Sequence, residues 1–158
     1  MTYLCAQFPL VRSSFKGSEE MIKFYSAGKL SSAQYWIDME ASHADFILTA
    51  RWPRLVGRGV EDSPENAKEF WVHDLEDVAE ADILMVLAPG LSDGVLRGAL
   101  VEVGAALALG IPVILIGGGD PNLGTWQYHP DITTVTNGFS AFAKARQLLK
   151  GKVSHPAL

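Results

Sequence analysis

Short runs of apolar residues recur along the chain, separated by segments in which apolar residues follow a helical spacing. Apolar runs of this kind are typical of parallel strands, because such strands are covered on both faces. They predict strands at residues 21–26, 44–52, 82–88, 112–116 and 132–136. The segments between them predict helices at residues 33–43, 64–79, 98–109 and 139–149.

The helix at 64–79 has the clearest start. Ser63 is expected to cap its free amides, and Pro64 suits its first turn. The spacing of Phe70, Leu75 and Val78 predicts that these side chains lie roughly on one face.

Strands that alternate with helices predict an α/β fold in which a five-stranded parallel sheet is covered on both faces, a three-layer sandwich. Right-handed crossovers limit the topology to a few doubly wound orders. We expect one domain at residues 21–150, preceded by an N-terminal extension at 1–20 and followed by a C-terminal tail at 151–158. Pro53 is expected to stop the second strand.

Composition narrows the class of protein. The 158 residues carry a net charge of −5, which disfavours binding to polymeric nucleic acid. Cys5 is the single cysteine, so no internal disulfide forms and a cytoplasmic location is expected. The most apolar stretch, residues 99–116, contains Glu102, glycines and Pro112, which favours a helix and a strand over a membrane span.

Ligands of doubly wound sheets bind beyond the carboxyl ends of the strands. This rule directs attention to residues 25–29, 51–53, 89–98 and 117–120. The candidate substrate-binding residues in the first three segments are Ser26, Gly28, Arg51, Trp52, Ser92, Asp93, Arg97 and Gly98. The fourth segment, Gly117-Gly118-Gly119-Asp120, lacks the spacing of a nucleotide-binding loop. The other tryptophans, Trp36, Trp71 and Trp126, are expected in the core.

Three residues are candidates for catalysis. Glu102 is a lone carboxylate near the start of an otherwise apolar helix, where it caps the helix, pairs with a surface lysine or takes part in chemistry. Tyr25, at the end of the first strand, either packs in the sheet or orients a carboxylate. Asp74 is either a solvated helix residue or part of the same site.

Other chemistries have little support. The histidines at positions 43, 73, 129 and 155 show no metal-ligand spacing, so we predict neither a metal nor another cofactor. The sequence has no nucleophile elbow, and Cys5 lies in the extension. Among the possible nucleophiles, a carboxylate is the one left after metal, serine and cysteine chemistry are set aside.

The chain resembles the nucleoside 2-deoxyribosyltransferase family, which includes the 2'-deoxynucleoside 5'-monophosphate N-glycosidases. The matching segments, in order, are Phe24-Tyr25-Ser26-Ala27-Gly28, then Asp74-Leu75 with Ala81-Asp82-Ile83, and Arg97-Gly98 through Glu102-Val103-Gly104-Ala105 to Gly110-Ile111-Pro112. The resemblance covers roughly residues 21 to 150. Its most specific part is the segment around Glu102.

The resemblance implies a flavodoxin-like, Rossmann-like fold and cleavage or transfer of the N-glycosidic bond of a (deoxy)nucleoside or its 5'-monophosphate. Glu102 would attack C1', Tyr25 would position that carboxylate, and Asp74 would contact or protonate the base. It also implies a homo-oligomer whose neighbouring subunits complete the site, and no cofactor.

One position departs from the family. Many members have a polar residue six positions before the glutamate, next to the 5' group of the sugar, where this chain has Leu96. The departure leaves open the choice between nucleoside and nucleotide. A non-catalytic nucleotide-sensing module on the same fold is the alternative function, and an electron carrier or receiver domain is a weaker one.

Overall fold

The computed structural model describes residues 20–56, 63–89 and 96–150. The predicted tail and, apart from residue 20, the predicted extension lie outside these ranges. The strands are β1 (Ile22–Ala27), β2 (Phe46–Leu48), β3 (Ile83–Leu87), β4 (Val113–Ile116) and β5 (Ile132–Val135). They form one parallel sheet in the order β2-β1-β3-β4-β5.

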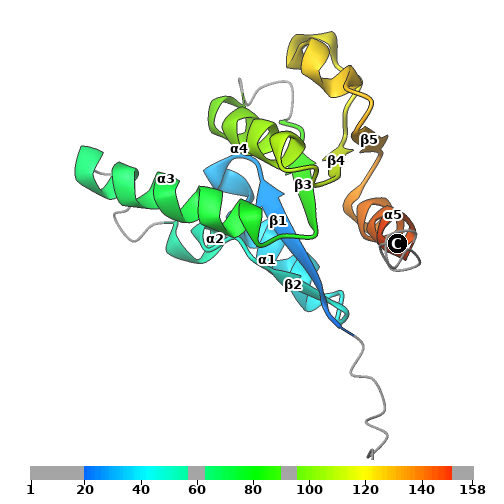
Figure 1. Cartoon of the computed structure of the whole chain (residues 1–158), viewed down its shortest axis with the longest axis horizontal. Coiled ribbons are helices and arrows are strands. Elements are labelled where there is room, and N and C mark those ends of the chain that lie inside the picture. Colours follow the sequence, from blue (N-terminus) through cyan, green and yellow to red (C-terminus); the bar gives the residue numbers. More distant parts are fainter. Residues whose placement is uncertain (1–19, 57–62, 90–95, 151–158) are drawn as a thin grey trace, which may run out of the picture.

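Helices cover both faces of the sheet, as Figure 1 shows. The α-helices are α1 (Ala33–Ala41), α2 (Trp52–Leu55), α3 (Pro64–Ala79), α4 (Arg97–Ala108) and α5 (Gly138–Lys150). Short 3-10 turns are η1 (Leu30–Ser32), η2 (Pro121–Leu123) and η3 (Thr125–Tyr128). Helices α3 and α4 pack side by side on one face, and α1 and α5 lie on the other. The predicted α/β, flavodoxin-like three-layer sandwich is confirmed.

Successive residues of β1 serve opposite faces of the sheet, because side chains alternate along a strand. Phe24 points to the α1–α5 side, where its ring packs against Phe142 at 5.1 Å and Trp36 at 6.4 Å between centroids. Tyr25 points to the α4 side and is fully buried there. One strand therefore supplies both a core residue and a candidate site residue.

The start of α3 is built as the sequence predicts. Ser63 is its cap, and the serine hydroxyl accepts a hydrogen bond of 3.1 Å from the amide of Asn66. The predicted face of this helix is partly wrong. Val78 is fully buried, but Leu75 is 41% exposed, and Asp74 and Asp77 take buried positions instead.

The second predicted strand is also partly wrong. It ends at Leu48, and Trp52 begins the short helix α2 with Pro53 in its first turn. Proline fits there because the first amides of a helix need no partner within the helix. The turn places the Trp52 ring under β1, where its Nε1 donates a 2.8 Å hydrogen bond to the carbonyl of Ser26.

Candidate active site

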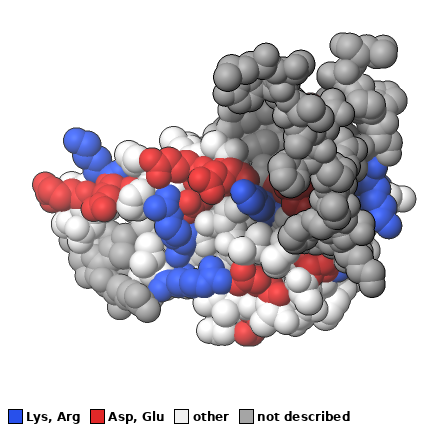
Figure 2. Space-filling view, turned by 60° about the horizontal axis from the view of Figure 1, so that its bottom comes forward, with Lys and Arg blue, Asp and Glu red and all other residues white. Residues whose placement is uncertain are grey.

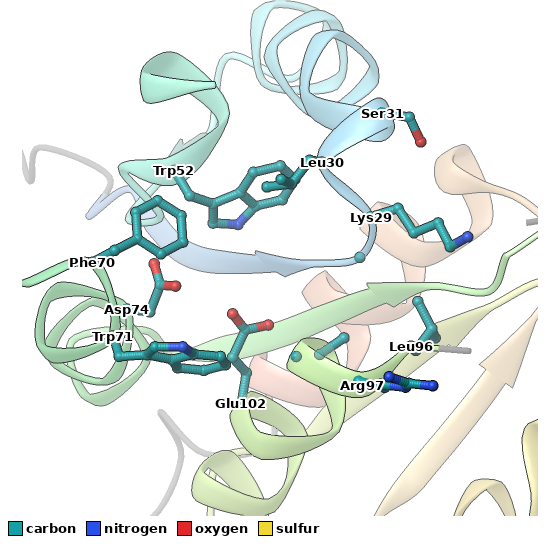
Figure 3. A pocket seen from close by; sticks show the side chains of 13 residues that line it. Lys29, Leu30, Ser31, Trp52, Phe70, Trp71, Asp74, Leu96, Arg97 and Glu102 are labelled. Carbon is teal, nitrogen blue, oxygen red and sulfur yellow. The ribbon is translucent and has the colours of Figure 1, made fainter. Parts of the chain in front are cut away.

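A cavity of about 510 Å³ opens at the carboxyl edge of the sheet (Figure 3). The order β2-β1-β3 makes β1 and β3 the strands at which the connections change direction, the place where doubly wound sheets bind ligands. The cavity is lined by Gly28, Lys29, Leu30, Ser31, Trp52, Phe70, Trp71, Asp74, Leu96, Arg97, Gly98, Ala99 and Glu102.

Two carboxylates that line this cavity lie next to one buried phenol. The Tyr25 hydroxyl donates a 2.8 Å hydrogen bond to Oε1 of Glu102, and both side chains are buried. Asp74 reaches the same cavity from α3 and is only 2% exposed. The structure thus brings together all three predicted catalytic residues, and the interpretation of Asp74 as a solvated helix residue is wrong.

Burial dominates the electrostatics of the site. It raises the pKa of Glu102 to about 8, while the hydrogen bond from Tyr25 lowers that pKa and the charge of Asp74 raises it. Burial also raises the pKa of Asp74 to about 7, with the negative charge of Asp77 as the next cause. The pKa of the Tyr25 hydroxyl is raised above its usual range by burial and by Glu102. Near neutral pH the two carboxyl groups together therefore hold a proton, and Tyr25 remains a donor.

Aromatic and cationic side chains line different parts of the cavity. Figure 3 shows Trp52, Phe70, Trp71 and Asp74 on one side of Glu102. On the other side, the same view shows the cations Lys29, from the loop after β1, and Arg97, at the first position of α4. The cavity thus offers flat apolar surface at one end and positive charge at the other.

Only some of the predicted binding residues line the cavity. Gly28, Trp52, Arg97 and Gly98 line the cavity, whereas Ser26 does not. Ser26 is fully buried, and its hydroxyl finds no hydrogen-bond partner within the described residues. Ser92 and Asp93 lie outside the described residues.

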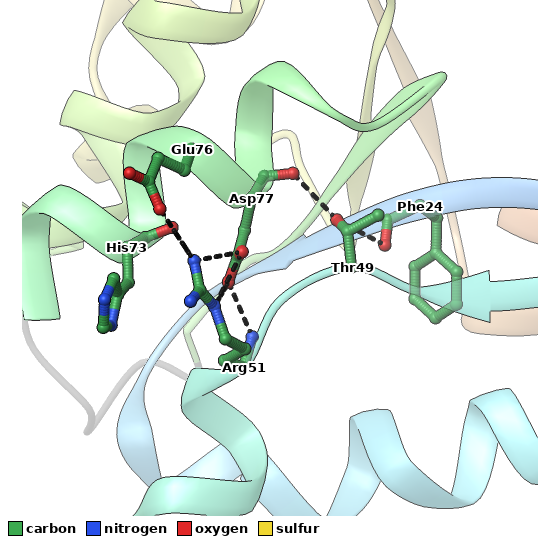
Figure 4. Close-up of polar contacts among 6 residues, drawn as sticks. All are labelled: Phe24, Thr49, Arg51, His73, Glu76 and Asp77. Atoms are coloured by element: carbon green, nitrogen blue, oxygen red, sulfur yellow. Dashed lines mark hydrogen bonds and ion pairs between the residues drawn. The ribbon is translucent and has the colours of Figure 1, made fainter.

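Arg51 does not line the cavity either. Its Nε donates to both carboxylate oxygens of Asp77, at 2.9 and 3.0 Å, and its backbone amide donates to Oδ2 at 2.9 Å (Figure 4). A further ion pair of 3.1 Å joins it to the exposed Glu76. Arg51 therefore fixes the end of β2 to α3 and acts on Asp74 only through charge.

Several residues of the cavity escaped the sequence prediction. Lys29 and Ser31 follow the glycine break after β1, a position that the sheet-edge rule indicates. Phe70 and Trp71 precede Asp74 by four and three residues, so the helical period places them near its face. Trp71, expected in the core, is instead 36% exposed and lines the cavity. The glycine segment 117–120 does not line it.

The structure has no metal-binding cluster of three or more His, Cys, Asp or Glu within its described residues. No helix in the described part of the chain is long and apolar enough to cross a membrane. On the face seen in Figure 2, acidic side chains interrupt the basic ones.

Comparison with known proteins supports the fold. No protein-family model matches the chain, and no curated protein matches it. A crystal structure of a conserved protein from Enterococcus faecalis V583 is similar, with a TM-score of 0.53 and 19% sequence identity. The match covers 80% of this chain and 98% of that one, so the two share one α/β fold over most of their length.

Proposed function

We propose that this protein cleaves or transfers the N-glycosidic bond of a (deoxy)nucleoside or its 5'-monophosphate through a glycosyl-enzyme intermediate on Glu102. The observation that carries the proposal is the buried Tyr25–Glu102 hydrogen bond beside Asp74 in one cavity. A phenol that donates to a carboxylate fixes its orientation and favours its ionised form, which is the form a nucleophile needs.

The first half-reaction follows from this arrangement. A Glu102 oxygen attacks C1' of the sugar, and the C1'–N bond breaks as the new C1'–O bond forms. The reactive form of the enzyme is the one in which Asp74 carries the proton and Glu102 is ionised. In that form the base leaves with the bonding electron pair and takes the proton from Asp74. The negative charge of Glu102 stabilises the oxocarbenium-like transition state before it captures the sugar.

The second half-reaction returns the enzyme to its starting state. Water, or a second free base, attacks C1' and displaces Glu102. Asp74, now ionised, accepts the proton that the incoming nucleophile loses. Hydrolysis and transfer therefore share one site and differ only in the acceptor.

The two ends of the cavity match the two ends of a nucleotide. Trp52, Phe70 and Trp71 offer flat apolar surface to a planar base, on the side of Glu102 where Asp74 lies. Lys29 and Arg97, on the other side, favour an anion. Leu96 is buried on the side of the two cations, in place of a polar residue, so recognition of the 5' group falls to these cations. This distribution favours the 5'-monophosphate over the nucleoside.

The test is a panel of nucleosides, deoxynucleosides and their 5'-monophosphates, with and without a second free base. Released or exchanged base is measured by chromatography. We expect the Glu102→Gln and Glu102→Ala variants to lose at least about 1000-fold in kcat. The Glu69→Gln variant is the matched control, because Glu69 is exposed on α3 and does not line the cavity.

Each outcome separates the candidates. Turnover that survives both Glu102 variants would show that another group is the nucleophile. Tight binding of the monophosphates without any turnover would support the nucleotide-sensing module instead.

A cytoplasmic location stays a prediction that rests on the single cysteine.

A further inference from the structure

Strand β1 extends beyond its neighbour on one side of the sheet. β2 pairs with β1 as far as Phe24, whereas β3 pairs with it as far as Ala27. Within the described residues, positions 25–27 therefore have a strand partner on one side of β1 only. This free edge carries Tyr25, whose hydroxyl donates to Glu102.

Two donors take the place of the missing strand along this edge. The carbonyls of Phe24 and Ser26 face the same side, because alternate carbonyls of a parallel strand serve the same neighbour. The Phe24 carbonyl accepts a 2.9 Å hydrogen bond from the amide of Thr49. The Ser26 carbonyl accepts a buried 2.8 Å hydrogen bond from Nε1 of Trp52. An indole N–H thus stands where the amide of a neighbouring strand is expected.

The path of the backbone explains why a side chain is needed there. In a continued parallel ladder, the residue two positions after Thr49 would donate to Ser26, and that residue is Arg51. The Arg51 amide donates instead to Oδ2 of Asp77, at 2.9 Å (Figure 4). The chain then turns into α2, and a buried carbonyl without a donor would cost free energy. Trp52 supplies that donor.

The same tryptophan also contributes to the cavity. It is 3% exposed and lines the cavity on the side of Glu102 where Asp74 lies (Figure 3). Its nitrogen serves the strand, while its ring is part of the apolar wall. A change that removes the N–H and keeps the ring therefore separates the two contributions.

We propose that Trp52 is a positioning residue for the Tyr25–Glu102 pair, because its indole N–H anchors the free edge of β1. The anchored carbonyl belongs to the residue next to Tyr25, so the bond limits movement of the backbone from which the phenol projects. The phenol in turn orients the carboxylate at 2.8 Å. The effect on catalysis rests on the proposed function, whereas the effect on Glu102 is measurable without a substrate.

The sharpest test replaces Trp52 by 3-benzothienylalanine, an analogue in which sulfur takes the place of the indole N–H. The ring keeps nearly its size and its apolar faces, and the donor is lost. Trp52→Phe is a second variant, made from an ordinary amino acid. The same two replacements at Trp71 are the matched controls, because Trp71 lines the same cavity but its ring lies beside Gly98 of α4.

The first readout is the ionisation of Glu102, followed by carbon NMR on protein with labelled glutamate. Absence of the signal in the Glu102→Gln variant identifies it. The hydrogen bond from Tyr25 lowers the pKa of Glu102, so a less well held phenol leaves that pKa higher. We expect the titration of Glu102 to move to higher pH in both Trp52 variants and to keep its wild-type position in both Trp71 variants.

The second readout is kinetic, on the substrate that the nucleotide panel identifies. In the benzothienylalanine variant of Trp52, kcat is expected to fall about 10-fold, the value of one well-placed hydrogen bond. KM should change little, because the wall that would contact the base is kept. The limb of the rate profile that Glu102 sets should move to higher pH together with the NMR titration.

Two outcomes would overturn the inference. One is a wild-type titration of Glu102 in a folded Trp52 variant, even one that melts at a lower temperature, because Trp52 would then stabilise the fold without positioning the pair. The other is an equal shift in the Trp71 variants, which would assign the effect to the polarity of the cavity. An enzyme without turnover would leave the titration result standing, so the inference and the proposed function fail separately.

Discussion

The Tyr25 hydroxyl and Oε1 of Glu102 lie 2.8 Å apart, although 77 residues separate them in the sequence. The contact joins the end of β1 to the first half of α4 at the floor of the cavity. A buried carboxylate with one fixed donor has a defined orientation and a pKa that this donor lowers. The hydroxyl therefore controls how much of Glu102 is ionised at a given pH.

The Tyr25→Phe variant removes this donor and keeps the ring. The pKa of Glu102 is expected to rise, so the limb of the rate profile that Glu102 sets moves to higher pH and less of the enzyme has an ionised Glu102 at neutral pH. Loss of a hydrogen bond to a charged group is worth about 1.5–3 kcal/mol, or roughly 10- to 150-fold in kcat/KM at neutral pH. Tyr35→Phe is the control, because Tyr35 is half-buried beside Trp36 and does not line the cavity. An unshifted profile in Tyr25→Phe would contradict the assigned role.

The Asp74→Asn variant removes the proton that the departing base takes. General acid catalysis contributes roughly 100- to 10,000-fold, so kcat on substrates with an uncharged base is expected to fall by that amount. A nucleoside whose base already carries a positive charge, such as N7-methylated guanosine, leaves without that proton and should lose far less. Equal losses on both substrates would contradict the role of Asp74 as an acid. Rates are measured by release of the free base.

The Arg51→Met variant leaves the buried Asp77 carboxylate with only its backbone donor. Because the Arg51 side chain is 45% exposed and screened by water, we expect a loss of about 2 kcal/mol in the free energy of unfolding rather than the full value of a buried pair. Removal of its positive charge also raises the pKa of Asp74, which moves the limb of the rate profile that Asp74 sets to higher pH.

The double variant Arg51→Met/Asp77→Asn tests that explanation. It removes both charges, so it should recover part of the lost stability in urea unfolding. Asp77 raises the pKa of Asp74, so its neutralisation should also bring the limb that Asp74 sets back toward lower pH. A double variant less stable than Arg51→Met would argue that the backbone contact, rather than the ion pair, is what matters.

Stability itself is expected to depend on pH through the site. The folded protein raises the pKa of Glu102 to about 8 and that of Asp74 to about 7, above the usual values of carboxyl groups. Below about pH 4 both groups are protonated in both states, and their stabilising contribution is fully present. As the pH rises toward 8 the unfolded chain releases these protons first, so stability falls.

This pH dependence is measurable by thermal unfolding between pH 5 and 9. A pKa that differs by one between the folded and unfolded chain changes the free energy of unfolding by about 1.4 kcal/mol, roughly 3–6 °C in Tm for a domain of this size. The Glu102→Gln variant, which cannot ionise there, should show a flatter profile and a higher Tm at alkaline pH. A variant with the wild-type slope would mean that other groups set the pH dependence.

Local chemistry explains which parts of the fold the sequence predicts. The start of α3 is predicted at the observed residue, because the capping hydroxyl of Ser63 and the proline at the next position are adjacent in the sequence. The end of β2 is not, because Pro53 is compatible with both the end of a strand and the first turn of a helix. The choice depends on tertiary contacts such as that of Trp52 with Ser26.

The same reasoning explains which site residues can be predicted from the sequence and which cannot. The alternation of strands and helices places Tyr25 and Glu102 at one sheet edge, so their approach is predictable once the fold is. The pairing of Arg51 with Asp77 joins two elements 26 residues apart in the sequence, and nothing local to Arg51 indicates it. A strand-end arginine alone therefore does not distinguish a ligand contact from a structural ion pair.

The alternation of Phe24 and Tyr25 along β1 has a consequence for redesign. The phase of that single strand decides which face of the sheet receives each side chain, so a slip of β1 by one residue against β2 and β3 would turn the phenol toward the aromatic core and a phenyl ring toward Glu102. Loops around the cavity can change length without this penalty. New specificities on this scaffold are thus best sought by exchanging loops, with the count of residues in β1 left untouched.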